Sequence, residues 1–282
     1  MHRVLSGPLK VETLTLAIAN LPTRCQGLKI VQLSDFHYDG LRLSERLLSE
    51  AIAASNQAKP DLVLLTGDYV TDDPTPIHRL VLRLKHLQSR AGIYAVLGNH
   101  DLYQRRSRAE VTTALEQIGI QVLWNQIAYP LGPGLALVGL PDYGSREFNP
   151  GLVLSQLPAE LPRIVLSHNP DSAVRLRSWR VDLQLSGHTH GGQIVIPGLG
   201  PLPPWFRKIR RLIPRRLQRR LPFLRNSCDK VLRHWEWSQG LHQVENNWLY
   251  VNRGLGTYLP GRLFCPPEVT VITLVSQPDE DA

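Results

Sequence analysis

Residues 29–37 read KIVQLSDFH, an apolar run that ends in a serine, an aspartate and a histidine. The same arrangement returns at residues 61–69, DLVLLTGDY, and at residues 92–101, GIYAVLGNHD. Short continuous apolar runs of this kind are typical of strands that are buried on both faces of a sheet. The chain therefore places polar side chains directly after three predicted buried strands.

Amphipathic segments follow each of these strands. Leucines and alanines recur at helical spacing in residues 43–56, 77–87 and 106–118, and Ser44 is a suitable N-cap for the first segment. Further strands are expected at residues 11–18, 135–139, 163–166, 183–185, 194–196, 248–251 and 269–274. Alternating strands and helices followed by a strand-rich half predict an α/β layered fold, with a mixed sheet or two sheets covered by helices. We expect residues 1–282 to form a single domain.

The composition is that of an ordinary globular protein. Of 282 residues, 43% are hydrophobic and 20% are charged, which excludes collagen-like, coiled-coil and disordered chains. No apolar run reaches the length of a membrane span, and the first residues lack the apolar centre of a signal peptide. Cys25, Cys228 and Cys265 are too scattered for a disulfide framework or a CxxC metal site, so we expect reduced thiols in a cytoplasmic protein.

The positive charge is concentrated in one segment. The formal net charge is +8, yet residues 205–225, WFRKIRRLIPRRLQRRLPFLR, contain eight arginines, one lysine and no acid. Apolar residues recur there at helical spacing, interrupted by Pro214 and Pro222, within an insertion at about residues 200–238. Trp205, Trp235 and Trp237 lie in this insertion, and tryptophan favours membrane interfaces. We expect an element that docks on an anionic membrane surface or forms a lid; a solvated helix and a nucleic-acid arm are the alternatives.

Two later strands also end in polar clusters. Residues 163–166 run into Ser167-His168-Asn169-Pro170, and residues 183–185 run into Ser186-Gly187-His188-Thr189-His190. In α/β sheets ligands bind outside the carboxyl ends of strands, so five such ends would gather two aspartates, one asparagine and four or five histidines in one crevice. Glycines at positions 67, 98 and 187 would let the backbone turn sharply and approach a ligand closely.

The residue types in this crevice indicate transition metals. Imidazole, carboxylate and amide ligands together suit Mn, Fe, Zn or Co, whereas Mg and Ca sites contain little histidine. Seven ligands are too many for one tetrahedral ion, and one shared carboxylate would divide them between two ions about 3.5–4 Å apart. Each motif alone is more often a simple turn, but the full ordered set is hard to obtain by chance.

The ordered set D-x-H, G-D, G-N-H-D, H and G-H-x-H resembles the calcineurin-like metallophosphoesterase superfamily, from Leu28 to about Val275. The resemblance implies a four-layer α/β/β/α sandwich of two mixed sheets flanked by helices. It implies two divalent ions, for which Mn²⁺ is expected and Fe or Zn are alternatives. The implied ligands are Asp35, His37 and His190 for one ion and Asn99, His168 and His188 for the other, with Asp68 as the bridge.

The resemblance also implies catalytic roles. His100 would lie beside the scissile phosphate and protonate the leaving oxygen, and Asp101 would orient His100. Asn99 and His100 would also contact the substrate. A water between two divalent cations has a lowered pKa, so hydroxide would be available to attack phosphorus in line with the leaving group.

Three further stretches indicate a branch of the superfamily. Residues 187–193 (GHTHGGQ), 251–257 (VNRGLGT) and 264–269 (FCPPEV) resemble a bacterial branch related to UDP-2,3-diacylglucosamine pyrophosphatases of lipid A synthesis. That resemblance implies an amphiphilic phosphate-ester or pyrophosphate substrate and a cytoplasmic protein at the inner face of the membrane. Arg253 and Arg262 are candidate phosphate contacts, or else structural arginines.

Two other functions stay open from the sequence. The first is a broad phosphodiesterase that acts on nucleotides or nucleic acid, although no nucleic-acid partner is expected, because the strands carry no aromatic stacking platform. The second is a non-catalytic scaffold for protein binding. All seven implied ligands and His100 are present, which argues against the scaffold.

Overall fold

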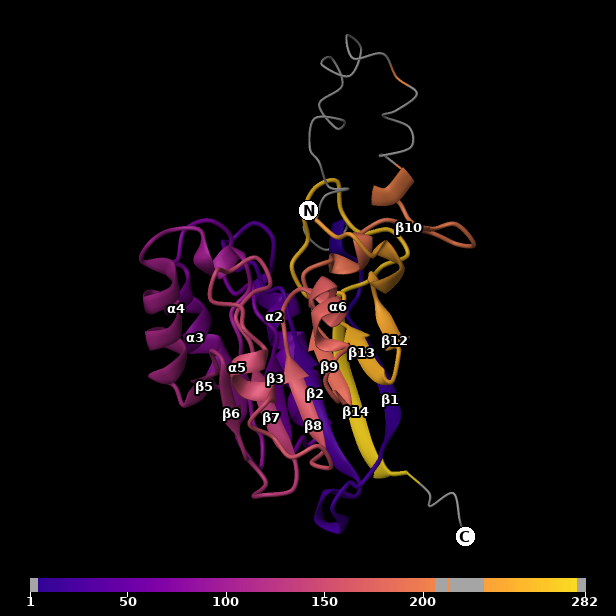
Figure 1. Cartoon of the computed structure of the whole chain (residues 1–282). Coiled ribbons are helices and arrows are strands. Elements are labelled where there is room, and N and C mark those ends of the chain that lie inside the picture. The colour runs from indigo at the N-terminus through magenta and orange to yellow at the C-terminus, as the bar shows by residue number, and fades with distance from the viewer. Residues whose placement is uncertain (1–4, 206–212, 214–230, 278–282) are drawn as a thin grey trace.

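The computed structural model describes residues 5–205, 213 and 231–277, and it is built on two six-stranded sheets (Figure 1). The first sheet contains, in spatial order, β1 (Lys10–Ile18), β14 (Glu268–Ser276), β2 (Leu28–Leu33), β3 (Leu62–Leu65), β4 (Ile93–Ala95) and β5 (Ile120–Val122). The second sheet contains β12 (Gly240–Val244), β13 (Asn247–Val251), β9 (Leu183–Ser186), β8 (Arg163–Leu166), β7 (Ala136–Gly139) and β6 (Gln126–Ala128).

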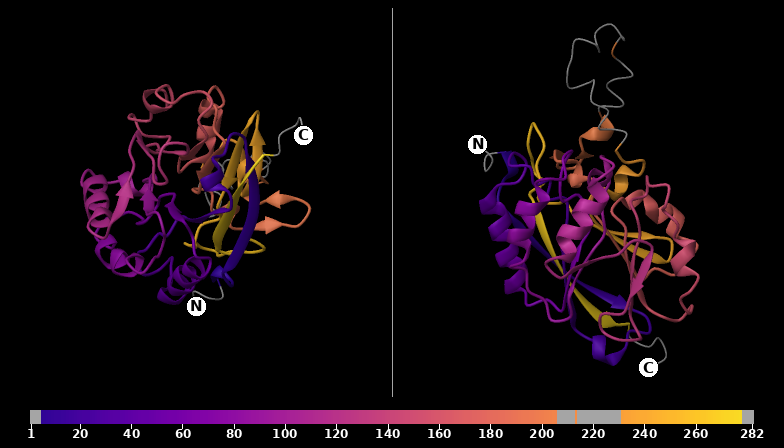
Figure 2. Two further views of the ribbon diagram at one scale, coloured as in Figure 1. Left: turned by 90° about the horizontal axis from the view of Figure 1, so that it is seen from below. Right: turned by 90° about the vertical axis from the view of Figure 1, so that its left-hand side faces the viewer.

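Helices cover the outer faces of both sheets. They are α2 (Glu45–Gln57), α3 (Ile77–Leu84), α4 (Ser107–Glu116), α5 (Gly151–Leu154) and α6 (Ala173–Leu176). Short 3₁₀ turns lie at η1 (Thr23–Cys25), η2 (His100–Leu102), η3 (Pro170–Ser172), η4 (His190–Gly192) and η6 (Trp235–Trp237), and β10 (Val195–Ile196) pairs with β11 (Gly200–Pro201) in a small hairpin. The right-hand view of Figure 2 shows purple helices on one outer side of the sheets and pink helices on the other.

Three apolar layers hold these elements together. Between the sheets, Ile30 and Leu64 of the first sheet pack with Ile164 and Leu185 of the second. A second layer joins the first sheet to α2, α3 and α4, and a third joins the second sheet to α5 and α6. Strands covered on both faces carry apolar side chains on both faces, as the continuous apolar runs predicted. The four-layer α/β/β/α sandwich is confirmed.

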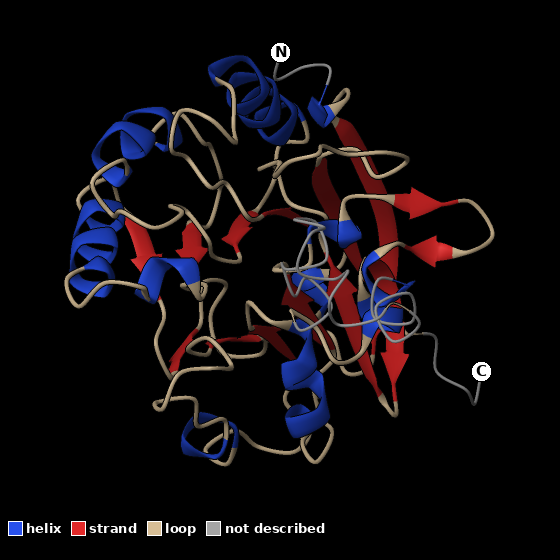
Figure 3. Cartoon of the chain, turned by 90° about the horizontal axis from the view of Figure 1, so that it is seen from above, coloured by secondary structure: helices blue, strands red, loops and turns tan. Residues whose placement is uncertain are grey.

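The direction of the strands decides where polar side chains meet. β2, β3, β4 and β5 run parallel in the first sheet, and β7, β8, β9 and β13 run parallel in the second. The polar residues that follow β2, β3, β4, β8 and β9 converge at one end of the sandwich, the end at which the β10–β11 hairpin lies (Figure 1). Figure 3 looks onto this end, where loops extend across the strand ends and the helices lie at the periphery.

The local predictions can be compared with the observed elements. The Ser44 cap is confirmed, since its hydroxyl accepts a hydrogen bond from the amide of Leu47 at 3.2 Å. Strands β5, β6 and β12 and helices α5 and α6 were not predicted, because three to five residues carry too little periodicity to stand out. Of residues 205–225, only two lie in the part of the chain that the structure describes, so the predicted basic helix lies outside the described residues. Among the described helices, none combines the length and the apolar run needed to cross a bilayer.

Candidate metal centre

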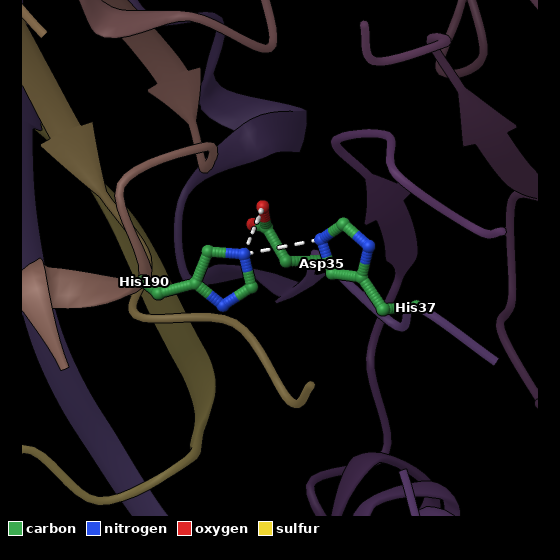
Figure 4. Close-up of side chains that lie close together, drawn as sticks. All are labelled: Asp35, His37 and His190. Carbon is green, nitrogen blue, oxygen red and sulfur yellow. Dashed lines mark hydrogen bonds and ion pairs between the residues drawn. The ribbon is translucent and has the colours of Figure 1, made fainter. Parts of the chain in front are cut away.

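The predicted ligands come together across the two sheets. Asp35 and His37 follow β2, Asp68 follows β3 and Asn99 follows β4, whereas His168 follows β8 and His188 and His190 follow β9. Their ligand atoms lie in three groups, each with atoms within 4.8 Å of one another: Asp35, His37 and His190 in the first, Asp68, His168 and His188 in the second, and His37, Asp68 and His100 in a third that links the other two. Figure 4 shows the first group, in which Asp35 and His37 from the loop after β2 and His190 from the loop after β9 point toward one another. The first two groups share members with the implied ligand sets of the two ions, and Asp68, the implied bridge, lies in the second and third groups.

The backbone at this centre is held in an unfavourable conformation. Asp35, His37, Asp68, His188 and His190 all have a positive φ, between 44° and 71°. Such values cost a non-glycine residue about 1–3 kcal/mol and persist only where the surrounding fold imposes them. The fold around the strand ends therefore imposes a left-handed backbone on five of the seven predicted ligands.

Two glycines make room for the carboxylates. A Cβ atom at Gly98 would overlap the carboxylate of Asp68, and one at Gly187 would overlap the carboxylate of Asp35 and the side chain of Ser34. The predicted close approach at Gly98 and Gly187 is therefore confirmed. The second sheet thereby reaches Asp35, whose two oxygens accept the amide of His188 at 2.9 and 3.0 Å.

The protein holds one nitrogen of each histidine ring and leaves the other at the centre. Nδ1 of His168 lies 2.7 Å from the Thr66 carbonyl, and Nε2 of His188 lies 3.0 Å from the Val231 carbonyl. A carbonyl accepts only from N–H, so the remaining nitrogen of each neutral ring carries a lone pair. These two inner nitrogens, Nε2 of His168 and Nδ1 of His188, lie 3.2 Å apart, so a proton on one of them or a metal ion between them is needed.

The other two rings repeat this arrangement. Nδ1 of His190 lies 3.1 Å from the Gly256 carbonyl, and Nδ1 of His37 lies 3.1 Å from the Tyr258 hydroxyl. Their Nε2 atoms then lie 3.1 Å apart. The Gly256 carbonyl leaves a lone pair on Nε2 of a neutral His190, whereas the Tyr258 hydroxyl can donate or accept and does not fix the tautomer of His37. A metal ion could take the place of a proton shared between the two Nε2 atoms. The arrangement of all four rings therefore fits metal ions at the centre.

The protonation states of the buried histidines in the crevice depend on burial and on the neighbouring carboxylates. Burial lowers the pKa of His37 to about 3 and that of His188 to about 4, so both rings are neutral at pH 7. Burial would also lower the pKa of His168, but the nearby carboxylates, above all Asp68, outweigh it and raise the pKa to about 10. Without a metal, a proton on His168 balances Asp68; a divalent ion would take the place of that proton.

Asp68 and Asn99 complete the donor set. Oδ2 of Asp68 lies 3.1 Å from Nε2 of His168 and 3.5 Å from Nε2 of His37, so one carboxylate faces both groups. Oδ1 of Asn99 is buried and has no hydrogen-bond partner within the described ranges. A buried amide oxygen without a partner is unfavourable, which fits an oxygen that accepts a metal ion.

His100 and Asp101 lie beside the centre but do not form the expected pair. Nδ1 of His100 lies 2.8 Å from the Thr71 carbonyl, and its amide donates to Asp68 Oδ1 at 2.9 Å. The buried carboxylate of Asp101 instead accepts four backbone amides, from residues 68, 69, 70 and 98, at 2.8–3.2 Å. In this structure Thr71 orients the His100 ring, and Asp101 fixes the loops that present Asp68 and Asn99.

The two candidate phosphate-binding arginines are engaged within the protein. Arg253 forms ion pairs with Glu12 at 2.8 Å and Glu268 at 2.9 Å. The Arg262 guanidinium donates to several backbone carbonyls, including Gly256 at 2.6 Å. These contacts favour the alternative interpretation of both residues as structural arginines, and the role of Arg253 as a substrate contact stays a prediction.

Some site residues were not predicted at all. The backbone carbonyls of four residues contact histidine ring nitrogens: Thr66, Thr71, Val231 and Gly256. Every residue has a backbone carbonyl, so the sequence does not indicate which ones will do so. Tyr258 follows the VNRGLGT stretch and packs edge-on against the rings of His37 and His190, with centroids 5.0 and 5.3 Å away. The position of Tyr258 directly after residues 251–257 was the feature of the sequence that could have indicated a role at the site.

Changing Asp68 to alanine should remove the carboxylate shared by both ligand groups. After loading with Mn²⁺ and removal of free ions, we expect about two ions per parent chain and a loss of at least one in Asp68→Ala, measured by elemental analysis. Asp61→Asn, which changes an acid outside the crevice, is the matched control and should keep the parent value. A parent that retains one ion per chain would rule out a dinuclear centre.

Comparison with known proteins agrees with this geometry. The calcineurin-like phosphoesterase family matches residues 28–192. The metallophosphoesterase YkuE of Bacillus subtilis is 32% identical over 95% of this chain and 87% of its own length. Phosphodiesterase YaeI of Escherichia coli is 34% identical, over 88% of this chain and 82% of its own. The UDP-2,3-diacylglucosamine pyrophosphatase LpxG of Chlamydia trachomatis is 28% identical over 92% of this chain and 88% of its own length. The resemblance carried by the ordered motifs is confirmed: the chain belongs to the calcineurin-like phosphoesterase family and is a hydrolase of phosphoester bonds.

Proposed function

We propose that this protein uses two divalent metal ions to hydrolyse a phosphodiester or pyrophosphate bond in an amphiphilic lipid precursor such as UDP-2,3-diacylglucosamine. The observation that carries the reaction is the convergence of four imidazoles, each with its outer nitrogen held by the protein, on Asp35, Asp68 and Asn99. The substrate class is supported by the similarity to LpxG and by the three branch stretches of the sequence. Mn²⁺ is the proposed ion, with Fe or Zn as alternatives.

The residues around the centre have distinct tasks in this proposal. Two bound ions would supply a water of lowered pKa and neutralise charge on the phosphoryl oxygens. His100 would give a proton to the leaving oxygen through Nε2, because Nδ1 is committed to the Thr71 carbonyl. Asp101 would act at a distance, by fixing the loops of Asp68 and Asn99.

The substrate is tested by product analysis. The Mn²⁺-loaded protein should cleave UDP-2,3-diacylglucosamine to UMP and the acylated sugar phosphate, and should cleave it faster than cyclic or linear nucleotides. Preference for nucleotides would instead support the alternative of a broad phosphodiesterase. Absence of turnover with these substrates and with a generic aryl phosphodiester would support the scaffold.

Replacing His100 should impair chemistry more than metal binding. We expect His100→Asn to keep both ions and to lose about 10²–10⁴-fold in kcat, the range for general acid catalysis. The loss should shrink for esters with very acidic leaving groups, which need no proton. His86→Asn, a change at an exposed histidine outside the crevice, should leave kcat unchanged. An equal loss for good and poor leaving groups would argue against the acid role.

We also propose that residues 205–225 dock the protein on the anionic inner face of the membrane, where an acylated substrate would be found. The support is the charge of eight arginines and one lysine in a chain whose net charge is +8, together with apolar residues at helical spacing. Described residues near both ends of this basic stretch lie near the centre: the Val231 carbonyl accepts a hydrogen bond from His188, and Leu202 and Pro203 line the same cavity as His188 and His190.

Liposome co-sedimentation tests this docking. Deletion of residues 205–225, or replacement of their arginines by glutamine, should reduce binding to anionic liposomes, and added salt should reduce binding of the parent because the attraction is screened. Turnover of a small water-soluble phosphodiester should change little, since no proposed ligand lies in the segment. Unchanged liposome binding in both variants would assign the segment to a solvated helix.

A further inference from the structure

Two cavities adjoin the metal centre, both lined in part by Asn99, and they differ in character. The first, here called the apolar cavity, has a volume of about 390 Å³ and reaches Asp68, His100 and His190. Its walls include Ile194, Leu202, Val231, Trp235, Leu259 and Pro260. Apolar surface therefore adjoins the site at which the phosphoryl group would be attacked.

The second cavity, here called the charged cavity, has a volume of about 440 Å³ and reaches the centre at Asn99. Arg105, Arg108 and Glu147 line it. The last two form an ion pair at 2.7 Å, and Arg108 stacks on Trp124 at 3.8 Å from the ring centroid. Arginine and glutamate side chains thus line the charged cavity, whereas the ionisable side chains of the apolar cavity are those of the centre itself and two tyrosines.

The walls of the apolar cavity are connected to the loop that carries His190, both along the chain and through hydrogen bonds. Past His190, the chain continues into Ile194, whose carbonyl accepts the amide of Leu202 at 2.8 Å across the β10–β11 hairpin. Gln193 accepts the amide of Tyr258 at 2.6 Å and so positions the loop that carries Leu259. Leu259 is 81% exposed and Val231 41% exposed, so these walls present apolar surface to solvent directly beside the ligands.

We propose that the apolar cavity holds a hydrocarbon chain of the substrate while the phosphoryl group lies at the metal centre. The polar remainder of the substrate then extends toward the charged cavity. This inference rests on the proposed phosphoesterase chemistry and adds to it the orientation of the substrate and the residues that select it. Burial of apolar surface is non-directional, so the cavity would favour chain length more than a particular chain structure.

A series of n-alkyl phosphates from methyl to hexyl tests the inference by direct binding. Calorimetric titration of the Mn²⁺-loaded protein should show a dissociation constant that falls with chain length, by up to about fourfold for each methylene that becomes buried. Leu202→Ser, in the wall, should flatten this dependence and leave methyl phosphate binding unchanged. Leu199→Ser is the matched control, because Leu199 lies in the same hairpin, is 58% exposed and does not line the apolar cavity.

The outcomes separate this inference from the proposed function. A parent that binds methyl phosphate and hydrolyses an aryl phosphodiester but shows no dependence on chain length would overturn the hydrocarbon site and leave the reaction standing. A dependence that Leu202→Ser and Leu199→Ser reduce equally would also overturn it, since a general surface effect would then explain the binding. A parent that neither binds methyl phosphate nor hydrolyses any ester would overturn the proposed function and this inference with it.

Discussion

The centre of this protein depends on one constraint: backbone carbonyls and a tyrosine hydroxyl hold the outer nitrogen of each histidine ring, so the inner nitrogens can only converge. For His168 and His188 the outer partners are carbonyls, which accept only from N–H and therefore fix the tautomer. The inner nitrogens then face each other at 3.2 Å. A proton on His168 or a metal ion must lie between them, and the carboxylates of Asp68 and Asp35 favour such positive charge.

This constraint uses both sheets. Thr66 lies after β3 of the first sheet, yet its carbonyl fixes His168 after β8 of the second. Asp35 of the first sheet accepts the amide of His188 from the second. The metal centre and the interface between the sheets are therefore one structure. Strain at five left-handed ligand residues persists because the apolar layer between the sheets holds the strand ends in place.

Chemistry and selectivity are located on different parts of the site. The reacting groups come from buried strand ends that the fold fixes, whereas the two cavities are bounded by loops and by the β10–β11 hairpin. Loops tolerate change better than the strands that they connect. The same centre could then serve relatives named as phosphodiesterase and as UDP-2,3-diacylglucosamine pyrophosphatase, with the surrounding loops setting what each accepts.

The sequence by itself determined the strand ends and their ligand types, because a buried strand must be continuously apolar and a metal ligand must be His, Asp or Asn. The resemblance of the ordered motifs to a known family then implied Asp35, His37, Asp68, Asn99, His168, His188 and His190 as the ligands, and Gly98 and Gly187 were expected as positions of close approach. The tertiary structure alone decided the partners of those ligands. Arg253 has a side chain suited to phosphate, but Glu12 and Glu268 occupy it, and they lie 241 and 15 positions away in the chain. Asp101 adjoins His100 in sequence, but four backbone amides take its carboxylate. A sequence names the groups that can bind, whereas the packing of segments distant in the chain decides which groups are already satisfied and which remain for a ligand.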